Sequence, residues 1–250
     1  MHDTIKKQPV SVFESAYGTI YNQECLESLR AIPDASIDLI MTDPPYLIRD
    51  THAGGHTELA RSIQPINDAL RDNDLVSGLN PAILPELVRI MKRINCYIWC
   101  NKAQIPEYFN FFVEGLGCSF DIIVWCKTNP PPLFNNKYLS DKEYCLYFRK
   151  SGYCQPTSYE AARTAYYQSI NVYDKKNYPH PTIKPLNIVK TLIGNSTRPG
   201  DIVLDPFLGS GTTAVACAEL GRQYIGYEIN REYFEVAQRR IQDTIERLDL

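Results

Sequence analysis

The sequence predicts a doubly wound α/β fold, in which helices cover both faces of a mostly parallel sheet. Short apolar runs rich in β-branched and aromatic residues recur along the chain, and helical patterns lie between them. Several runs are continuously apolar, as expected of strands that are buried on both faces. With 250 residues and a hydrophobic content of 44%, the chain is long enough for one large domain or two small ones.

Six apolar runs predict strands, and five segments predict helices. The expected strands are Ile37–Met41, Cys96–Cys100, Ile122–Cys126, Tyr144–Phe148, Ile202–Leu204 and Tyr224–Tyr227. The expected helices are Pro81–Arg93, Pro106–Gly115, Pro185–Gly194, Thr212–Leu220 and Arg231–Leu248. Their alternation favours a doubly wound arrangement of the sheet.

The last two helices carry the clearest end signals. Asn230 stands directly before the final helix, where its side chain is suited to an N-cap. Gly221 follows the preceding helix, where a C-terminal glycine belongs. The final helix has an apolar stripe formed by Phe234, Ala237, Ile241, Ile245 and Leu248.

Two segments break the alternation. Residues Leu47–Asn80 are polar and predict a long mobile loop, which at that length is usually functional or disordered. The second segment, Lys127–Pro179, interrupts the strand pattern and is a candidate recognition region. From Lys127 to Lys190 there are ten Lys and Arg residues, four Asp and Glu residues, and nine of the 17 tyrosines. Interleaved basic and aromatic residues suit a surface that contacts nucleic acid, although a solvated β surface rich in tyrosine has the same composition.

Composition excludes several other classes of protein. No apolar run approaches the length of a membrane span, and the N-terminus has no apolar core, so we expect a cytoplasmic protein without a membrane partner. The eight cysteines include no CxxC pair, which favours reduced core residues over zinc ligands or disulfides. No metal is expected.

The stretch "DIVLDPFLGSGTTAVACAEL" predicts a strand, a glycine turn and a helix. Gly209 and Gly211 allow a tight turn with close approach to a ligand, and the helix N-terminus offers free N–H groups. Glu228 ends the next expected strand, where an acid accepts hydrogen bonds from ribose hydroxyls. This pattern suits an adenosine-type cofactor, including NAD or FAD, and a tight turn without ligand is the structural alternative.

Asp205, directly before the glycine turn, favours one cofactor. Its carboxylate would repel a pyrophosphate and attract an ammonium group. Phe207 adds an aromatic face nearby. The cofactor inferred is therefore S-adenosylmethionine rather than a dinucleotide.

The stretch "MTDPPYLIRD" ends an apolar run with an acid, two prolines and a tyrosine. Neither proline has an N–H group for a sheet, so the strand must end there and the chain must turn. With both "DPPY" and "DPFLGSGTT" present, the chain resembles the S-adenosylmethionine-dependent amino-methyltransferases of DNA. Further stretches that resemble the family follow in its order: "SLRAIPDASIDLIMTDPPY", "IIVWCKTNP", "KEYCLYFRK", "HPTIKPLNIVKTLI" and "YIGYEIN".

The resemblance covers nearly the whole chain and implies one catalytic domain, residues 1–250. DPPY precedes the glycine loop, as in the permuted β-type arrangement. The implied fold is a doubly wound, mostly parallel, seven-stranded Rossmann-like methyltransferase sheet. Its motif order is circularly permuted, and a small recognition region is inserted.

The DPPY turn has a chemical rationale of its own. An exocyclic amine of a base is a poor nucleophile, because its lone pair is delocalised into the ring. The Asp43 carboxylate and the Pro44 carbonyl can accept its two N–H groups and draw the nitrogen toward a tetrahedral geometry. Tyr46 offers a face for stacking an extruded base. By resemblance, an aspartate at the first motif position implies adenine N6 as the target, with cytosine N4 as the alternative. An RNA methyltransferase and an NAD- or FAD-dependent oxidoreductase are less favoured.

The residues expected at the site fall into three groups. The catalytic group is Asp43, Pro44, Pro45 and Tyr46. The cofactor group is Asp205, Pro206, Phe207, Gly209, Ser210, Gly211, Thr212, Thr213 and Glu228, with Thr182, Lys184 and Glu24 added by resemblance. Family members often carry Gly-Asp where this chain has Gln23-Glu24. The DNA-contacting group is Asn135, Asn136, Lys137, Lys175 and Lys176. Double-stranded DNA is the expected partner, and a homodimer and a cognate restriction endonuclease are further candidates.

Overall fold

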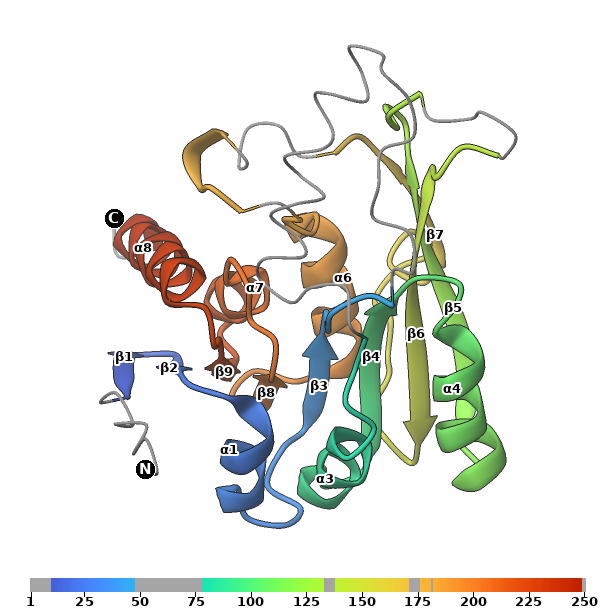
Figure 1. Cartoon of the computed structure of the whole chain (residues 1–250), viewed down its shortest axis with the longest axis horizontal. Helices are drawn as coiled ribbons and strands as arrows, with labels where there is room; N and C mark the ends of the chain where they lie inside the picture. Colours follow the sequence, from blue (N-terminus) through green and yellow to red (C-terminus); the bar gives the residue numbers. More distant parts are fainter. Residues whose placement is uncertain (1–9, 48–77, 133–137, 171–175, 181, 249–250) are drawn as a thin grey trace, which may run out of the picture.

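The computed structural model describes residues 10–47, 78–132, 138–170, 176–180 and 182–248, and its strands form one sheet (Figure 1). The sheet order is β1-β2-β9-β8-β3-β4-β6-β5-β7. The strands are β1 (Ser11–Ser15), β2 (Gly18–Asn22), β3 (Leu39–Thr42), β4 (Ile94–Cys100), β5 (Ser119–Lys127), β6 (Lys142–Lys150), β7 (Ala165–Gln168), β8 (Ile202–Asp205) and β9 (Gln223–Tyr227). The helices are α1 (Cys25–Ala31), α3 (Ile83–Ile90), α4 (Ile105–Phe109) with the π-helical turn η1 (Asn110–Gly115), α6 (Leu186–Ser196), α7 (Thr212–Leu220) and α8 (Arg231–Leu248).

The predicted fold class is confirmed. The five strands from β2 through β9, β8 and β3 to β4 are all parallel, and β6 runs antiparallel between β4 and β5. The sheet has nine strands rather than seven, because β1 and β7 extend its two edges. Both edge strands are short and half exposed, so they lack the continuous apolar run by which the buried strands are recognised.

Helices cover both faces of the sheet (Figure 1). Side chains of α6, α7 and α8 pack with one set of strand residues, and side chains of α1, α3 and η1 pack with the other. The alternation is clear in β3, where Leu39 and Met41 belong to the first core and Ile40 to the second. Each central strand is therefore buried on both faces.

Most predicted helices are found close to their expected bounds. α7 and α8 begin and end as predicted, Asn230 accepts from the N–H of Tyr233 at 3.1 Å, and Gly221 ends α7 with φ 66°. α3 is shorter than predicted, because Met91 turns to extended backbone. The segment that begins at Pro106 divides into α4 and the π-helical turn.

The sheet has a topological switch point between β8 and β3. After β8 the chain enters α7 on one face and continues to β9, whereas after β3 it leads to α3 on the other face and continues to β4. Ligands of open α/β sheets bind outside the carboxyl ends of the strands at such a point. The fold alone therefore places the candidate site at the ends of β3 and β8.

The two segments that break the alternation are only partly among the described residues. Most of the expected loop at 47–80 lies outside the described residues, and the candidate recognition region at 127–179 contains β6 and β7. All eight cysteines are free, six of them buried. No described helix has the length and apolarity that crossing a membrane would need.

Two glycine-to-alanine substitutions test the packing of the sheet in opposite directions. Gly18 has φ +154°, and a Cβ there would lie 2.0 Å from the carbonyl oxygen of Tyr224 on β9. We expect Gly18→Ala to lower the free energy of unfolding by about 3 kcal/mol or more. Gly194 lies within α6 with nothing within 4 Å of the added Cβ, so Gly194→Ala is expected to raise it by about 0.5–1 kcal/mol. Urea denaturation measures both, and equal stability of the two variants would contradict the β2–β9 pairing.

Candidate functional site

A cavity of about 340 Å³ lies at the carboxyl ends of β3, β8 and β9. This volume falls within the range of about 300–1,000 Å³ that is usual for small-molecule sites. Of the predicted site residues, its lining includes Glu24, Asp43, Pro45, Thr182, Lys184, Asp205, Pro206, Phe207, Gly209, Ser210, Thr212, Thr213 and Glu228. Pro44, Tyr46 and Gly211 are not part of the lining that the described residues form. The structure thus brings the DPPY and glycine-loop motifs to one cavity.

The glycine loop has two positions that need glycine. Gly209 has φ 54°, and a Cβ there would lie 3.1 Å from Nε2 of His180. Gly211 has φ 81°, and a Cβ there would lie 3.1 Å from Cβ of Ala237 on α8. Left-handed backbone and close neighbours together exclude larger side chains. The loop is therefore packed between His180 on one side and α8 on the other.

Glu228, at the end of β9, is tied to the glycine loop. Its Oε2 accepts from the N–H of Gly209 at 2.8 Å, and its Oε1 accepts from the N–H of Asn230 at 2.8 Å. Burial raises the pKa of Glu228, and these backbone donors partly offset the rise. Each carboxylate oxygen retains a lone pair for a further donor, such as a ribose hydroxyl.

Asp205, at the end of β8, is buried among donors. Its Oδ1 accepts from the Thr42 hydroxyl at 3.0 Å and from the N–H of Phe207 at 3.1 Å, and its Oδ2 accepts from the Thr213 hydroxyl at 2.6 Å. Burial raises the pKa of Asp205 to about 7, against the opposing effect of these hydrogen bonds. Asp205 has no cationic partner among the residues that the structure describes, and a buried carboxylate of this kind favours a ligand that carries positive charge.

The cavity suits the cofactor predicted from the sequence. Two carboxylates, Asp205 and Glu228, line it, and Phe207 contributes an aromatic ring. The N–H of Gly209 already donates to Glu228, so it does not serve as a phosphate donor here. An adenosine ligand with an ammonium group matches these donors and acceptors better than a pyrophosphate does.

The DPPY turn leaves β3 and is held by two amide side chains. Gln104 donates to the carbonyl oxygen of Pro45 at 3.1 Å, and Asn101 donates to the carbonyl oxygen of Leu47 at 2.8 Å. Both amides follow β4, the neighbouring parallel strand. The turn that carries Asp43 is therefore held at Pro45 and Leu47.

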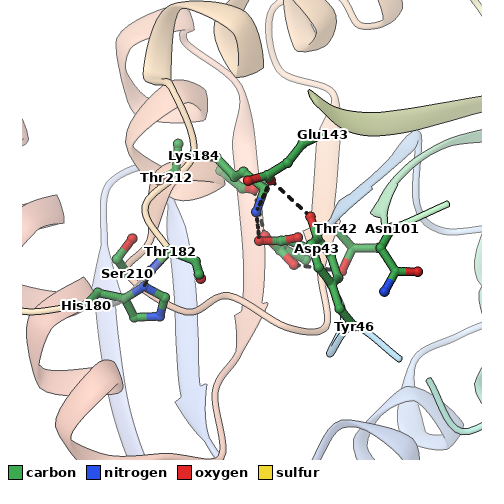
Figure 2. A network of polar contacts seen from close by, with 12 residues as sticks. Thr42, Asp43, Tyr46, Asn101, Glu143, His180, Thr182, Lys184, Ser210 and Thr212 are labelled. Carbon is green, nitrogen blue, oxygen red and sulfur yellow. Dashed lines mark hydrogen bonds and ion pairs between the residues drawn. The ribbon is translucent and has the colours of Figure 1, made fainter. Parts of the chain in front are cut away.

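A buried ionic network surrounds Asp43 (Figure 2). Lys184 donates from Nζ to Oδ2 of Asp43 at 2.5 Å and lies 3.2 Å from Oε2 of Glu143. Lys127 binds the other oxygen of Glu143 at 2.6 Å, and the Tyr46 hydroxyl donates to Oε2 at 3.2 Å. Two carboxylates and two ammonium groups are thus paired, so the network has no net charge.

Asp43 retains one unused acceptor. Its Oδ1 is buried and has no hydrogen-bond partner among the described residues, although Asp43 lines the cavity. Burial raises the pKa of Asp43, Lys184 opposes the rise, and Glu143 adds to it. Buried polar atoms are almost always paired, so this oxygen indicates a binding position for a donor from a ligand.

Some predicted residues have other contacts than expected. Both carboxylate oxygens of Glu24 cap α1, accepting from the N–H groups of Leu26 and Glu27 at 2.8 and 3.1 Å. Its role toward a cofactor stays a prediction. Asn135, Asn136, Lys137 and Lys175 lie outside the described residues, and Lys176 is exposed. No group of three or more His, Cys, Asp or Glu side chains that could hold a metal ion occurs within the described ranges.

Sequence reasoning missed four residues that hold the site together: Thr42, Lys127, Glu143 and Arg240. Arg240 is 3% exposed and donates to the Ser210 carbonyl oxygen at 3.3 Å and to the Thr212 hydroxyl at 2.8 Å. The sequence offered two signals for them. Arg240 stands next to the apolar stripe of α8, and Glu143 is an acid at the start of the apolar strand β6. Charged residues at buried positions need partners, and here those partners are at the site.

Comparison with known proteins finds similarity to DNA methyltransferases in both sequence and fold. A model of the DNA methylase family N6_N4_Mtase matches residues 37–239. The Type II methyltransferase M2.MboI of Moraxella bovis is 29% identical over 240 residues, 88% of this chain and 86% of that protein. The M1.HpyAVI–SAM complex matches with a TM-score of 0.59 at 29% identity, over 89% of this chain and 98% of that chain. PvuII DNA methyltransferase (cytosine-N4-specific) matches with a TM-score of 0.68, over 94% of this chain and 93% of that chain; at 17% identity it supports the fold alone.

Arg240 provides a test of how the glycine loop is held. Arg240→Met removes the donors to Ser210 and Thr212, so the loop loses its anchor on α8. We expect affinity for S-adenosylhomocysteine, measured by calorimetry, to fall about tenfold, equivalent to about 1.4 kcal/mol. Arg239→Met, at an exposed neighbouring position, is the matched control. Equal affinities of the two variants would contradict the anchoring role.

The protonation of Asp205 predicts how cofactor binding depends on pH. Its pKa of about 7 means that lowering the pH through 7 protonates the carboxylate and removes its attraction for an ammonium group. We expect the affinity for S-adenosylhomocysteine to be constant above about pH 8 and to fall progressively below pH 7. Calorimetry from pH 6 to pH 8.5 measures this, with Asp205→Asn as a variant that should bind weakly without this pH dependence. A wild-type affinity that does not change across the range would contradict the assignment.

Proposed function

The chain belongs to the DNA methylase family, whose amino-methyltransferases use S-adenosylmethionine, and from this premise we propose that it methylates the exocyclic N6 amine of adenine in double-stranded DNA. The observation that carries the proposal is Oδ1 of Asp43, which has no hydrogen-bond partner in the described part of the chain, beside a cavity that Asp205 and Glu228 also line. It offers an acceptor for an amine next to a site suited to the cofactor.

The residues of this chain prepare the amine for attack. S-adenosylmethionine supplies an electrophilic methyl group on its sulfonium. Asp43 accepts one N–H of the amine at Oδ1, and the Pro44 carbonyl accepts the other. These acceptors draw the lone pair out of the base ring, so the nitrogen becomes nucleophilic.

Asp43 also accounts for the proton that the reaction releases. As the N–C bond forms and the S–C bond breaks, the nitrogen becomes positively charged and must lose one proton. Oδ1 is the nearest acceptor in this arrangement, while Oδ2 keeps its hydrogen bond from Lys184. The raised pKa of Asp43 makes it a better base than an exposed aspartate.

The base must leave the duplex to reach this position. Tyr46 lies beside Asp43 in the turn, and Glu143 fixes its hydroxyl, so its ring is held in place for stacking an extruded base. An aspartate at the first position of the motif favours adenine over cytosine. Both amines pose the same chemical problem, so the base is settled by analysis of the product.

The exposed side chains of the segment 127–179 suit contact with DNA. Tyr138, Tyr159 and Tyr167 are 99%, 82% and 74% exposed, and Arg163 is exposed nearby in the sequence. Aromatic faces with interspersed cations are typical of nucleic-acid surfaces. We include residues 127–179 in the proposal as the recognition region, together with a cytoplasmic location, a homodimer and a cognate restriction endonuclease as further partners. The endonuclease is suggested by the name of the Type II relative.

Expression in a methylation-deficient host tests the reaction and the base together. Sequencing that is sensitive to modified bases is expected to show N6-methyladenine in one short motif. N4-methylcytosine would move the assignment to the other amine. Ring-carbon methylcytosine, or unmodified DNA in cells that contain cofactor-bound protein, would contradict the function.

Substitution of Asp43 tests the proposed amine acceptor directly. Asp43→Asn keeps the shape of the side chain but loses the charge, and we expect transfer to fall by at least about 10³-fold. Cofactor binding, measured by calorimetry, should change by less than about threefold, because Asp205 and Glu228 are intact. Asp43→Ala serves as a second variant, and retention of more than about a tenth of the wild-type rate by either would show that Asp43 is not the amine acceptor.

A further inference from the structure

We propose that Glu143 is a positioning residue for this reaction: it holds the Lys184 ammonium on Oδ2 of Asp43 and the Tyr46 hydroxyl beside it, which leaves Oδ1 as the acceptor for the substrate amine. The inference rests on the proposed function and extends it to Glu143, a residue of the stretch "KEYCLYFRK" that is not among the predicted catalytic or cofactor residues. Glu143 itself does not line the cavity formed by the described residues, so it acts through its neighbours.

One oxygen of Glu143 joins the two sides of the site. Oε2 lies 3.2 Å from Nζ of Lys184 and accepts from the Tyr46 hydroxyl at 3.2 Å. The remaining oxygen, Oε1, binds Lys127 at 2.6 Å. Glu143 therefore satisfies three donors while its side chain is only 16% exposed. Figure 2 shows Lys184 lying between Glu143 and Asp43, and the Tyr46 hydroxyl connected to the Glu143 carboxylate.

The position of Glu143 in the fold explains why it can serve as an anchor. It lies on β6, which is paired on both sides, with β4 and with β5. Lys184 is on the segment before α6, and its long side chain has many rotamers to lose. A second anion on a central strand restricts that side chain to one place, as a preorganised site requires.

The charges of the network support the same role. Burial would raise the pKa of Glu143, but Lys184 and Lys127 outweigh this effect and bring it to about 2. Glu143 is therefore a carboxylate at neutral pH. Lys184 is 7% exposed, and a buried ammonium is stable only between such anions.

The pH dependence expected of a Glu143 variant depends on all the titratable groups that face Asp43. These are Lys184 before α6, Glu143 and Cys145 on β6, Cys100 on β4, Tyr108 on α4, Asp205 on β8 and Tyr46 in the turn. Of the groups that influence the pKa of Asp43 most strongly, Lys184 lowers it and Glu143 raises it. Neutralising Glu143 should therefore shift the ionisation of Asp43 to lower pH.

Glu143→Gln tests the positioning role. The near-identical shape keeps the strand intact, but the amide cannot accept from all three donors. We expect kcat to fall about 10- to 100-fold, as for a misplaced catalytic group, with KM for S-adenosylmethionine within about twofold of wild type. The acid limb of the kcat/KM profile should move to lower pH. Lys142→Gln, at an exposed neighbouring position on β6, is the matched control and should match wild type.

A charge-matched double variant separates positioning from net charge. Glu143→Gln with Lys127→Met removes one charge of each sign, so the network is again neutral, but Lys184 still lacks its anchor. A kcat that stays as low as in Glu143→Gln supports the proposal. Recovery of wild-type kcat in the double variant, or a Glu143→Gln rate within twofold of wild type, would overturn it.

A measurement without turnover keeps this inference separate from the proposed function. A lysine ammonium that is fixed by hydrogen bonds gives an observable NMR resonance, which Lys184→Arg assigns by its loss. The Lys184 resonance is expected in the wild-type protein and is expected to broaden or disappear in Glu143→Gln. An unchanged resonance would overturn the positioning role, whereas a wild-type protein that leaves DNA unmodified would contradict only the proposed function.

Discussion

The ion pair between Lys184 and Asp43 is the interaction on which the rest of the site depends. It joins the end of β3 to the segment before α6, across 141 residues of sequence. Without this ammonium, Asp43 and Glu143 would be two carboxylates in one partly buried site, and like charges there resist ionisation together. With it, one oxygen of Asp43 is committed to the protein and the other is left for a ligand. This one contact therefore makes the two oxygens of Asp43 different: Lys184 binds Oδ2, and Oδ1 has no partner among the described residues.

The sheet brings Asp43 close to two further acids. Asp43, Asp205 and Glu228 follow or end β3, β8 and β9, which are adjacent and parallel. Their side chains therefore meet at one edge of the sheet, at the switch point between β8 and β3. Thr42 links two of the strands by donating to Asp205. The spacing between the proposed position for the amine and the proposed cofactor site is thus set by the register of adjacent parallel strands.

The sequence could predict the parts of this site that are local. DPPY, the glycine loop and the acid after β9 are each contiguous with a strand, and α7 was found from its turn glycines and its apolar run. The pairing of Glu143 with Tyr46, 97 residues away, could not be read from spacing, because it depends on β6 inserting antiparallel between β4 and β5. Strands β1, β2 and β7 were missed because most of their residues are only partly buried or exposed. The candidate DNA contacts at Asn135, Asn136, Lys137 and Lys175 lie outside the described residues.

Glu143 and Asp43 share Lys184 but have different environments, and this difference supports different roles for the two acids. Glu143 has a second ammonium, Lys127, and its pKa falls to about 2, so it remains an anion and an anchor. Asp43 has Lys184 on one oxygen only, and burial raises its pKa, so it can exchange a proton. Pairs of titratable groups whose environments drive their pKa values apart divide into a fixed charge and an acid or base. Lys127 contributes to this difference because it binds Glu143 and not Asp43, although it is not part of the cavity lining that the described residues form.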